Sequence, residues 1–276
     1  MLPKEGKAKC SGGGSGGNNQ NKAEDGHCRG NSTMKVVLLR VGIDSGCGGI
    51  QGPLFQDRTF EFIPIPDDGH STMDAIETQT YGNTEGKYGR PLKDFFRSKS
   101  RQSRMEDRPI HADPEFKTYT YGDPAKLKSG LKFLEEGDML VFYCGLEGWD
   151  FKCDPALYLM GYFEVLKAGL AADFEPDVID RLFSENSHVM HRDLFREQKD
   201  QLVLVKGSSK SRLLKKAVLI STMDLDKAGR RIKILSPEMR DKFGNFDGHL
   251  AIQRSPPRKV EPAFVDIAAK FVRSLD

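Results

Sequence analysis

The chain has 276 residues, and its 42 Lys and Arg against 40 Asp and Glu leave a formal net charge of +2. A charge this small does not identify a nucleic-acid-binding protein, so such a role would depend on local basic patches. No run of about 18 apolar residues is present to span a membrane. The five cysteines form no CxxC pair, and no histidine lies at zinc-ligand spacing from any of them. The sequence therefore predicts a soluble cytoplasmic protein without a metal site or a cofactor.

The first 33 residues differ in composition from the rest of the chain. Residues 1–33 are rich in glycine, serine, asparagine and charge, with hardly a large apolar side chain. Such a segment cannot bury enough surface to offset the entropy of ordering, so we expect a disordered leader. It is either a linker or regulatory tail, or an upstream extension before Met34. Residues 34–276 are expected to form a single domain with its own core.

A glycine-rich loop follows the first predicted strand. The stretch "KVVLLRVGI" is β-branched and leucine-rich, and "TFEFIPIPDD" alternates apolar with polar residues, so both are predicted strands. The glycines between them permit positive φ and let a ligand approach the backbone. Asp44 either caps the amides of a tight turn or accepts hydrogen bonds from a flat or phosphorylated ligand. The ligand-contacting residues predicted here are Asp44, Ser45, Gly48, Gly49 and, after the second strand, Asp67.

The densest positive stretch in the chain is "GRPLKDFFRSKSRQSRMEDR". Lys and Arg neutralise phosphates and aromatic rings stack on bases, so this is the best candidate for a nucleic-acid contact. The alternative is a solvated loop or helix face with Phe95 and Phe96 turned inward. The residues predicted to contact a nucleic-acid backbone are Arg97, Lys99, Arg101 and Arg104, with Lys210 from a later turn.

The middle of the chain predicts a hairpin. "LKSGLKFLEEGDMLVFYCG" reads as a short amphipathic helix, a turn at Gly137 and Asp138, and a buried strand that ends at Tyr143; "LYLMGYFEVLKA" is a second strand. Trp149 lies between them and is either a stacking platform for a base or a lid on the barrel. The predicted fold is α+β, with a PUA-like mixed β-barrel or strongly curved sheet and peripheral helices.

The second half of the chain holds two histidines and a basic segment. "DFEPDVIDRLFSENSHVMHRDLFREQKD" predicts a short helix and then a polar loop with His188 and His191. A metal site would need a third ligand, which the pattern does not place. After the predicted strand "QLVLVKG", the turn beside Arg212 either holds a phosphate or is the start of a solvated helix. The chain closes with a strand, a loop and an amphipathic helix.

Several of these stretches, in order, carry a family resemblance. "MKVVLLRVGIDSGCGGIQGPLF", "FIPIPDD", "HADPEF", "GDMLVFYCG", "YLMGYFEV" and "NSHV" together resemble the third type of nucleotide modification associated domain, from Met34 to about Ile220. The strands alone also resemble PUA and EVE modules, which bind nucleic acid or modified bases. The resemblance implies an association with phage and bacterial systems that alter DNA bases, and it implies no established reaction.

Two main hypotheses follow. The favoured one is a nucleic-acid-associated module that recognises a modified base or nucleotide, with Asp44 on a base edge, Tyr143 or Trp149 stacked on the ring, and Arg212 on a phosphate. The alternative is a nucleotide- or DNA-modifying enzyme whose acid, base or metal-ligating groups are Asp44, Asp67, Asp113 and His188. A purely structural partner in a modification complex is the third. DNA or a nucleotide is the expected partner.

Overall fold

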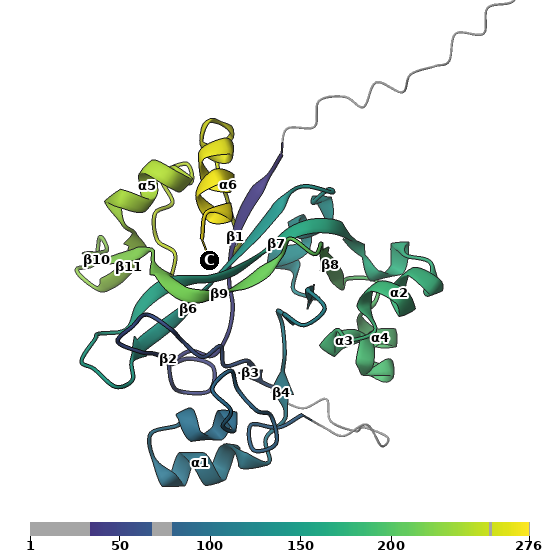
Figure 1. Cartoon of the computed structure of the whole chain (residues 1–276). Helices are drawn as coiled ribbons and strands as arrows, with labels where there is room; N and C mark the ends of the chain where they lie inside the picture. Colours follow the sequence, from purple (N-terminus) through teal and green to yellow (C-terminus); the bar gives the residue numbers. More distant parts are fainter. Residues whose placement is uncertain (1–33, 68–78, 254–255, 276) are drawn as a thin grey trace, which may run out of the picture. The chain divides into compact units, whose positions relative to one another are not determined.

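The computed structural model describes residues 34–67, 79–253 and 256–275, and the predicted leader lies outside these ranges. Its centre is an eight-stranded mixed sheet with helices around it (Figure 1), so the predicted α+β class is confirmed. The strands are β1 (Val36–Arg40), β2 (Gly52–Leu54), β3 (Ile65–Pro66), β4 (Ile110–His111), β5 (Thr120–Asp123), β6 (Met139–Gly148), β7 (Ala156–Leu170), β8 (Val203–Gly207), β9 (Arg212–Leu219), β10 (Ser221–Leu225), β11 (Arg231–Leu235) and β12 (Arg258–Lys259).

Short helices cover the sheet and its ends. The α-helices are α1 (Lys99–Glu106), α2 (Pro176–Phe183), α3 (Ser187–Met190), α4 (Arg192–Gln198), α5 (Pro237–Phe243) and α6 (Val265–Arg273). The 3₁₀ helices are η1 (Leu92–Phe95), η2 (Lys126–Phe133), η3 (Ala171–Asp173) and η4 (Pro262–Phe264).

The strand order explains why the sheet is mixed. The main path is β12-β1-β6-β7-β8-β5, with β2 added beside β6 and β9 beside β7. β1 and β2 run parallel to β6, whereas β7 is antiparallel to β6, β8 and β9. The predicted barrel is not confirmed, because the described strands form an open sheet with β12 and β5 at its two ends. β7 pairs with β6 and β9 along its first part and with β8 along its last, with register shifts on the way.

The predicted hairpin is present as β6 and β7. Gly137 has φ of 90°, a left-handed conformation that favours glycine, and lies in the turn before β6. Asp138 fixes this turn, since its carboxylate accepts hydrogen bonds from the amides of Lys35 (2.7 Å) and Glu135 (2.8 Å). The two strands then pair from Met139 opposite Glu164 to Leu146 opposite Ala156.

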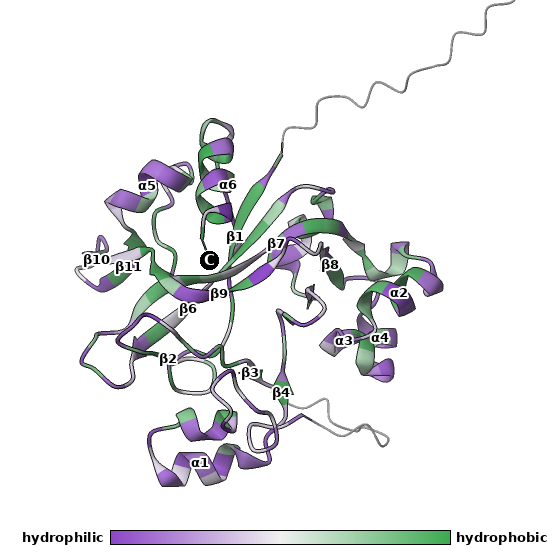
Figure 2. Ribbon diagram, in the orientation of Figure 1, coloured by the Kyte–Doolittle hydropathy of each residue, from purple (hydrophilic) through white to green (hydrophobic). Residues whose placement is uncertain are grey.

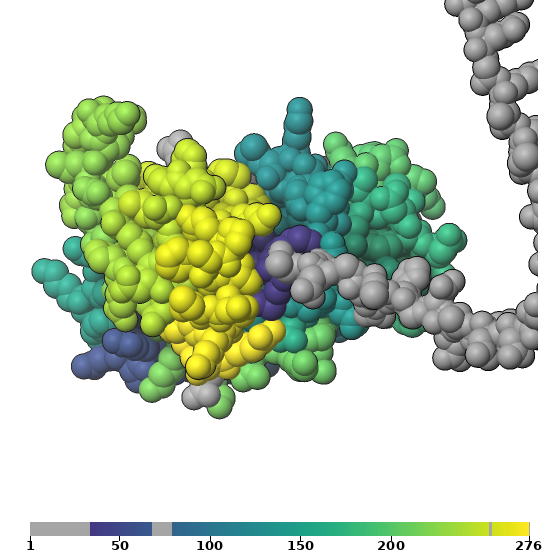
Figure 3. All heavy atoms as spheres, turned by 90° about the horizontal axis from the view of Figure 1, so that it is seen from above, coloured from purple at the N-terminus to yellow at the C-terminus, as the bar shows by residue number. Residues whose placement is uncertain are grey.

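Apolar residues of β1, β6 and β7 form the main core, while α2 and α1 each cover a smaller cluster. Figure 2 shows the contrast between β1, which is largely hydrophobic, and α1, which is largely hydrophilic. The C-terminal helix α6 packs against β1, and Figure 3 shows the yellow C-terminal segment beside the purple residues of the first strand.

Three local predictions were wrong. Only Ile65–Pro66 of the stretch "TFEFIPIPDD" is a strand, because Pro64 and Pro66 lack the amide hydrogen that a longer ladder needs. The basic segment after Ser211 is the strand β9 and not the start of a helix, since it pairs antiparallel with β7 and buries Leu214 and Ala217. His188 lies in α3 and not in a loop, because Asn186 caps that helix through the amide of His188.

Glu61 is a buried carboxylate whose charge opposes folding at high pH. The side chain is 5 % exposed, and Oε2 has no hydrogen-bond partner among the residues described. Burial raises the pKa of Glu61 from the ordinary 4.5 to about 7, although hydrogen bonds from nearby backbone amides and the charge of Lys87 oppose the shift. Because the folded state holds this proton more tightly, the stability from this group is complete below pH 4.5 and is lost as the pH rises through 7.

Glu61→Gln is therefore expected to stabilise the protein at alkaline pH only. We expect the free energy of unfolding to rise by about 1–2 kcal/mol at about pH 8.5 and to change little at about pH 5. Urea denaturation at the two pH values measures the difference. Glu136→Gln is the control, because Glu136 is exposed and should show no pH-dependent gain. An equal gain for Glu61→Gln at both pH values would contradict the raised pKa.

Candidate functional site

A pocket of about 390 Å³ lies where the loop after β1 meets β4 and β5. Its volume is within the range of small-molecule sites, which is roughly 300–1,000 Å³. The residues that line it combine charged, aromatic and glycine positions; they are Arg40, Val41, Gly42, Asp44, Ile65, His111, Asp113, Tyr121, Gly122, Asp123 and Lys128. The pairing of Ile65 with His111 between β3 and β4 brings the two halves of this lining together.

Two ion pairs are part of the pocket lining. Nη2 of Arg40 lies 2.8 Å from Oδ2 of Asp44, and Nζ of Lys128 lies 2.6 Å from Oδ2 of Asp123. The hydroxyl of Tyr121 also donates to Asp123, at 2.9 Å. Both fixed cations of the pocket lining are therefore paired with carboxylates.

Asp44 is first of all a turn residue. Its Oδ1 accepts hydrogen bonds from the amides of Gly46 (2.7 Å) and Cys47 (2.8 Å), which confirms the capping role. Its Oδ2 is paired with Arg40. A ligand that bonds to Asp44 must therefore compete with Arg40.

Beside the pocket, one carboxylate faces two imidazoles. Oδ2 of Asp113 lies 3.2 Å from Nε2 of His111 and 3.4 Å from Nε2 of His188. Each of these contacts is an ion pair when the imidazole is protonated. In the described part of the chain no hydrogen-bond donor other than the two imidazoles reaches this buried oxygen. The two rings pack edge to face with their centroids 4.6 Å apart. One potential ligand atom from each of the three residues lies within 4.8 Å of those of the other two.

The groups around this cluster hold it in place. Oδ1 of Asp113 accepts hydrogen bonds from Nδ2 of Asn186 (2.9 Å) and from the amide of Gly122 (3.2 Å). Nδ1 of His188 lies 2.9 Å from Oε1 of Gln198, at the end of α4. A side chain at position 122 would not fit, because a Cβ there would meet Oδ1 of Asn186 at 2.8 Å and Cδ2 of His188 at 2.9 Å.

The two histidines have opposite electrostatic tendencies. Burial lowers the pKa of His188, and repulsion from His111 adds to this effect while the charge of Asp113 opposes it. Burial acts in the same direction on His111, but the contact with Asp113 and the charges of Asp113, Asp67 and Asp123 outweigh it and raise the pKa of His111. One neutral imidazole and one readily protonated imidazole thus share a carboxylate. Such a set is suited to proton exchange or to holding a cation.

The structure brings together part of the predicted carboxylate and histidine set. Asp44 and Asp113 line the pocket, His188 contacts Asp113, and Asp67 acts on His111 through its charge. His111 was missed, although "IHADPEF" contains a signal for it. Residues 111 and 113 are two apart, and in an extended segment such residues lie on the same face.

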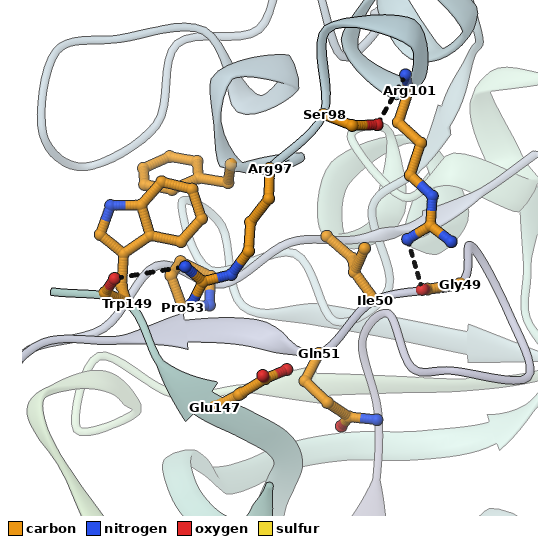
Figure 4. Close-up of a pocket in the computed structure, with 10 residues that line it drawn as sticks. Gly49, Ile50, Gln51, Pro53, Arg97, Ser98, Arg101, Glu147 and Trp149 are labelled. Atoms are coloured by element: carbon orange, nitrogen blue, oxygen red, sulfur yellow. Dashed lines mark hydrogen bonds between the residues drawn. The ribbon is translucent and has the colours of Figure 1, made fainter. Parts of the chain in front are cut away.

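A second pocket, of about 220 Å³, lies between the glycine-rich loop and α1 (Figure 4). Arg97 donates to the carbonyl of Gly148, and its guanidinium lies 4.7 Å from the centroid of the Trp149 ring. Nη1 of Arg101 donates to the carbonyl of Gly49 at 2.9 Å. The two arginines therefore attach α1 to the rest of the chain, and both line the second pocket.

The aromatic stacking predictions are mostly overturned. Tyr143 is fully buried and its hydroxyl donates to the carbonyl of Ile252, so it cannot stack on a base. Phe95 and Phe96 are turned inward, as the alternative proposed. Trp149 is half-buried and packs edge to face on Phe95, with ring centroids 5.6 Å apart.

The other predicted positions lie outside the first pocket. Ser45, Lys99 and Arg104 are exposed, and Gly48 packs closely on the side chain of Ile43. Lys210 is paired with Glu164 at 3.3 Å, and Arg212 lies 5.8 Å from the centroid of the Tyr162 ring.

The fold and the site define a mixed α and β protein with a histidine and carboxylate pocket beside an open sheet. The chain belongs to the family of nucleotide modification associated domain 3, whose sequence model matches residues 35–273. The match extends well beyond Ile220, so the closing helix α6 is part of the family domain. No curated protein and no solved structure matches the chain. Within the described ranges, no helix is both long and apolar enough to cross a membrane.

Proposed function

We propose that this protein binds the base of a nucleotide, free or within DNA, in the pocket of about 390 Å³ and modifies it through the histidine and carboxylate cluster. Family membership supports the nucleotide as the ligand. The observation that carries the proposal is Asp113, a buried carboxylate whose Oδ2 faces two imidazoles. Titratable groups with perturbed pKa values in a concave site support a catalytic role, because general acids and bases need shifted pKa values.

The charges of the pocket favour a base over a phosphate. Arg40 and Lys128 each already hold a carboxylate, so a phosphate would have to displace Asp44 or Asp123. A base edge instead offers donors and acceptors in alternation, which suits paired cations and carboxylates. The hydroxyl of Tyr121 adds one more polar group to the lining.

The same geometry favours catalysis over recognition alone. A reader of bases needs an accessible ring on which the base stacks. Tyr143 is buried, and Trp149 already packs against Arg97 and Phe95. The pocket with Asp113 has instead the composition of a reactive site.

A nucleic-acid strand would reach this pocket along α1. Arg101 contacts Gly49 in the loop that also carries Asp44, so the exposed basic residues of α1 are joined to the pocket wall. In this proposal Lys99 and Arg104 contact phosphates, which adds affinity without sequence preference.

Binding is tested by fluorescence anisotropy of matched single-stranded oligonucleotides with and without modified bases, at low and high salt. Lys128→Met keeps the apolar stem of the side chain and removes the ammonium group that lines the pocket. We expect it to weaken binding about 10-fold. Lys126→Met is the matched control, because Lys126 is exposed on the same helix η2, and it should change affinity by less than about twofold.

The two functional hypotheses differ in what happens to the bound base. If Asp113→Asn binds oligonucleotides normally but the wild type alone alters the mass of the base, the protein is an enzyme. If neither changes the base and binding depends on its modification, the protein is a reader. Equal losses for Lys128→Met and Lys126→Met, or an absence of binding by the wild type, would contradict the proposed pocket.

A further inference from the structure

We propose that His111, Asp113 and His188 bind one divalent transition-metal ion beside the pocket, through two imidazole nitrogens and one carboxylate oxygen. This inference deepens the proposed function, since the ion would lie next to the proposed base. The evidence for the metal ion is the geometry of the three side chains, and metal binding can be measured without a nucleotide.

The first observation is the orientation of Asp113. The side chain is 7 % exposed, and two donors, the amide group of Asn186 and the backbone amide of Gly122, hold Oδ1. Oδ2 therefore points toward the two histidines, and no other hydrogen-bond donor reaches it within the part of the chain that the structure describes. The charge of a buried carboxylate is costly unless it is compensated, and a bound cation compensates it.

The second observation is the spacing of the three donor atoms. Metal bonds to imidazole and carboxylate are about 2.0–2.2 Å long, which puts neighbouring ligand atoms roughly 2.8–3.6 Å apart at coordination angles of about 90–110°. The distances from Oδ2 of Asp113 to the two Nε2 atoms, 3.2 and 3.4 Å, lie in this range. All three ligand atoms lie within 4.8 Å of one another, so their spacing is compatible with coordination of one ion.

The third observation is the support of the ligands. Nδ1 of His188 lies 2.9 Å from Oε1 of Gln198, an atom that only accepts hydrogen bonds. The tautomer that donates from Nδ1 to this oxygen has its lone pair on Nε2, the atom that faces Asp113. This is how a second layer of residues normally orients a metal-binding histidine. Asn186 holds two of the three proposed ligands, since its Nδ2 donates to the carboxylate of Asp113 and its Oδ1 accepts from the backbone amide of His188.

The ligand set defines the class of metal. Two imidazoles disfavour Mg²⁺ and Ca²⁺, which prefer oxygen, and suit Fe²⁺, Co²⁺, Ni²⁺ or Zn²⁺. Three protein ligands leave coordination positions free, and His111 and Asp113 line the pocket. Such an open arrangement is that of a catalytic site and not of a closed structural one.

The test measures metal binding by the full chain after treatment with a chelator and dialysis. Zn²⁺ or Co²⁺ is added, and bound metal per chain is counted by atomic emission. Because thiolates also bind these ions, the comparison is between variants. We expect His188→Ala to hold one metal ion fewer than the wild type, while His249→Ala, at an exposed histidine, holds the same number. The visible spectra of the Co²⁺-loaded wild type and His188→Ala are then compared. The absorption present only in the wild type should be that of Co²⁺ with nitrogen and oxygen ligands, without the bands of a thiolate ligand.

Gln198→Leu is a second test, which still applies if His188→Ala does not fold. Gln198 is a positioning residue, so its loss should keep the stoichiometry and weaken affinity about 10–100-fold. Equal stoichiometry, Co²⁺ spectrum and affinity in the wild type, His188→Ala and Gln198→Leu would overturn the site. Metal binding without any nucleotide binding would uphold the site and reject the proposed function.

Discussion

Phe142→Ala is expected to lower the free energy of unfolding by about 3–5 kcal/mol. Phe142 is 0 % exposed in the middle of β6. Its ring centroid lies 4.7 Å from that of Phe163, 5.7 Å from that of Phe116 and 6.0 Å from that of Tyr121. Truncation removes these contacts and leaves a cavity that the surrounding strands cannot fill by moving. Urea denaturation measures the loss.

Phe133→Ala is the matched control. Phe133 is 66 % exposed at the end of η2, so its truncation should change stability by less than about 0.5 kcal/mol. A cost for Phe142→Ala no larger than for this control would mean that the aromatic cluster does not support the sheet. Tyr121 lines the pocket and packs on Phe142, so we also expect weaker ligand binding by the core variant.

Asn186→Ala is expected to cost about 2–4 kcal/mol of stability, which is unusual for a small polar residue. Asn186 is 0 % exposed, and its amide group donates to Asp113 at 2.9 Å and accepts from the amide of His188 at 3.1 Å. Removal leaves both partners buried with a bond missing and removes the cap of α3. Thermal and urea unfolding measure the loss.

Asn245→Ala separates this effect from the general cost of removing an asparagine. Asn245 is exposed, and its side chain accepts a hydrogen bond from the amide of Gly248 at 3.3 Å. We expect its truncation to cost less than about 0.5 kcal/mol. If the two variants were equally stable, the hydrogen bonds around Asp113 would not contribute to folding. Asn186→Ala should also weaken metal binding about 10–100-fold if the proposed metal site is correct.

The geometry of the candidate site weakens the hypothesis of a base reader and strengthens the hypothesis of a modifying enzyme. The favoured interpretation of the sequence was a reader of modified bases, with Tyr143 or Trp149 as the stacking ring. The burial of Tyr143 removes one of these rings, and Arg97 lies over the other. The alternative, a carboxylate and histidine site, gains Asp113 beside His188 and a second imidazole from His111. These contacts are the reason why we propose a modifying site, and not a reader of bases, in the pocket between the loop after β1 and β5.

Local sequence determined the elements that depend on local patterns. The first strand, the turn at Gly137, the hairpin of β6 and β7, and the closing helix follow from apolar periodicity and turn chemistry within short windows. The capping role of Asp44 follows from a short polar side chain in a glycine-rich turn. The family was also evident from short stretches in order, and the match to residues 35–273 confirms it.

Tertiary structure alone decided the site. Asp113 and His188 are 75 positions apart, and the main-chain path of β4, β5 and α3 brings them within 3.4 Å. The environment of Tyr143 is equally non-local, because its hydroxyl donates to the carbonyl of Ile252, which lies 109 positions away. The third member of the cluster, His111, carries no signal beyond its spacing from Asp113. Sequence patterns report which groups can do chemistry, whereas pKa values, burial and coordination depend on which distant groups become neighbours.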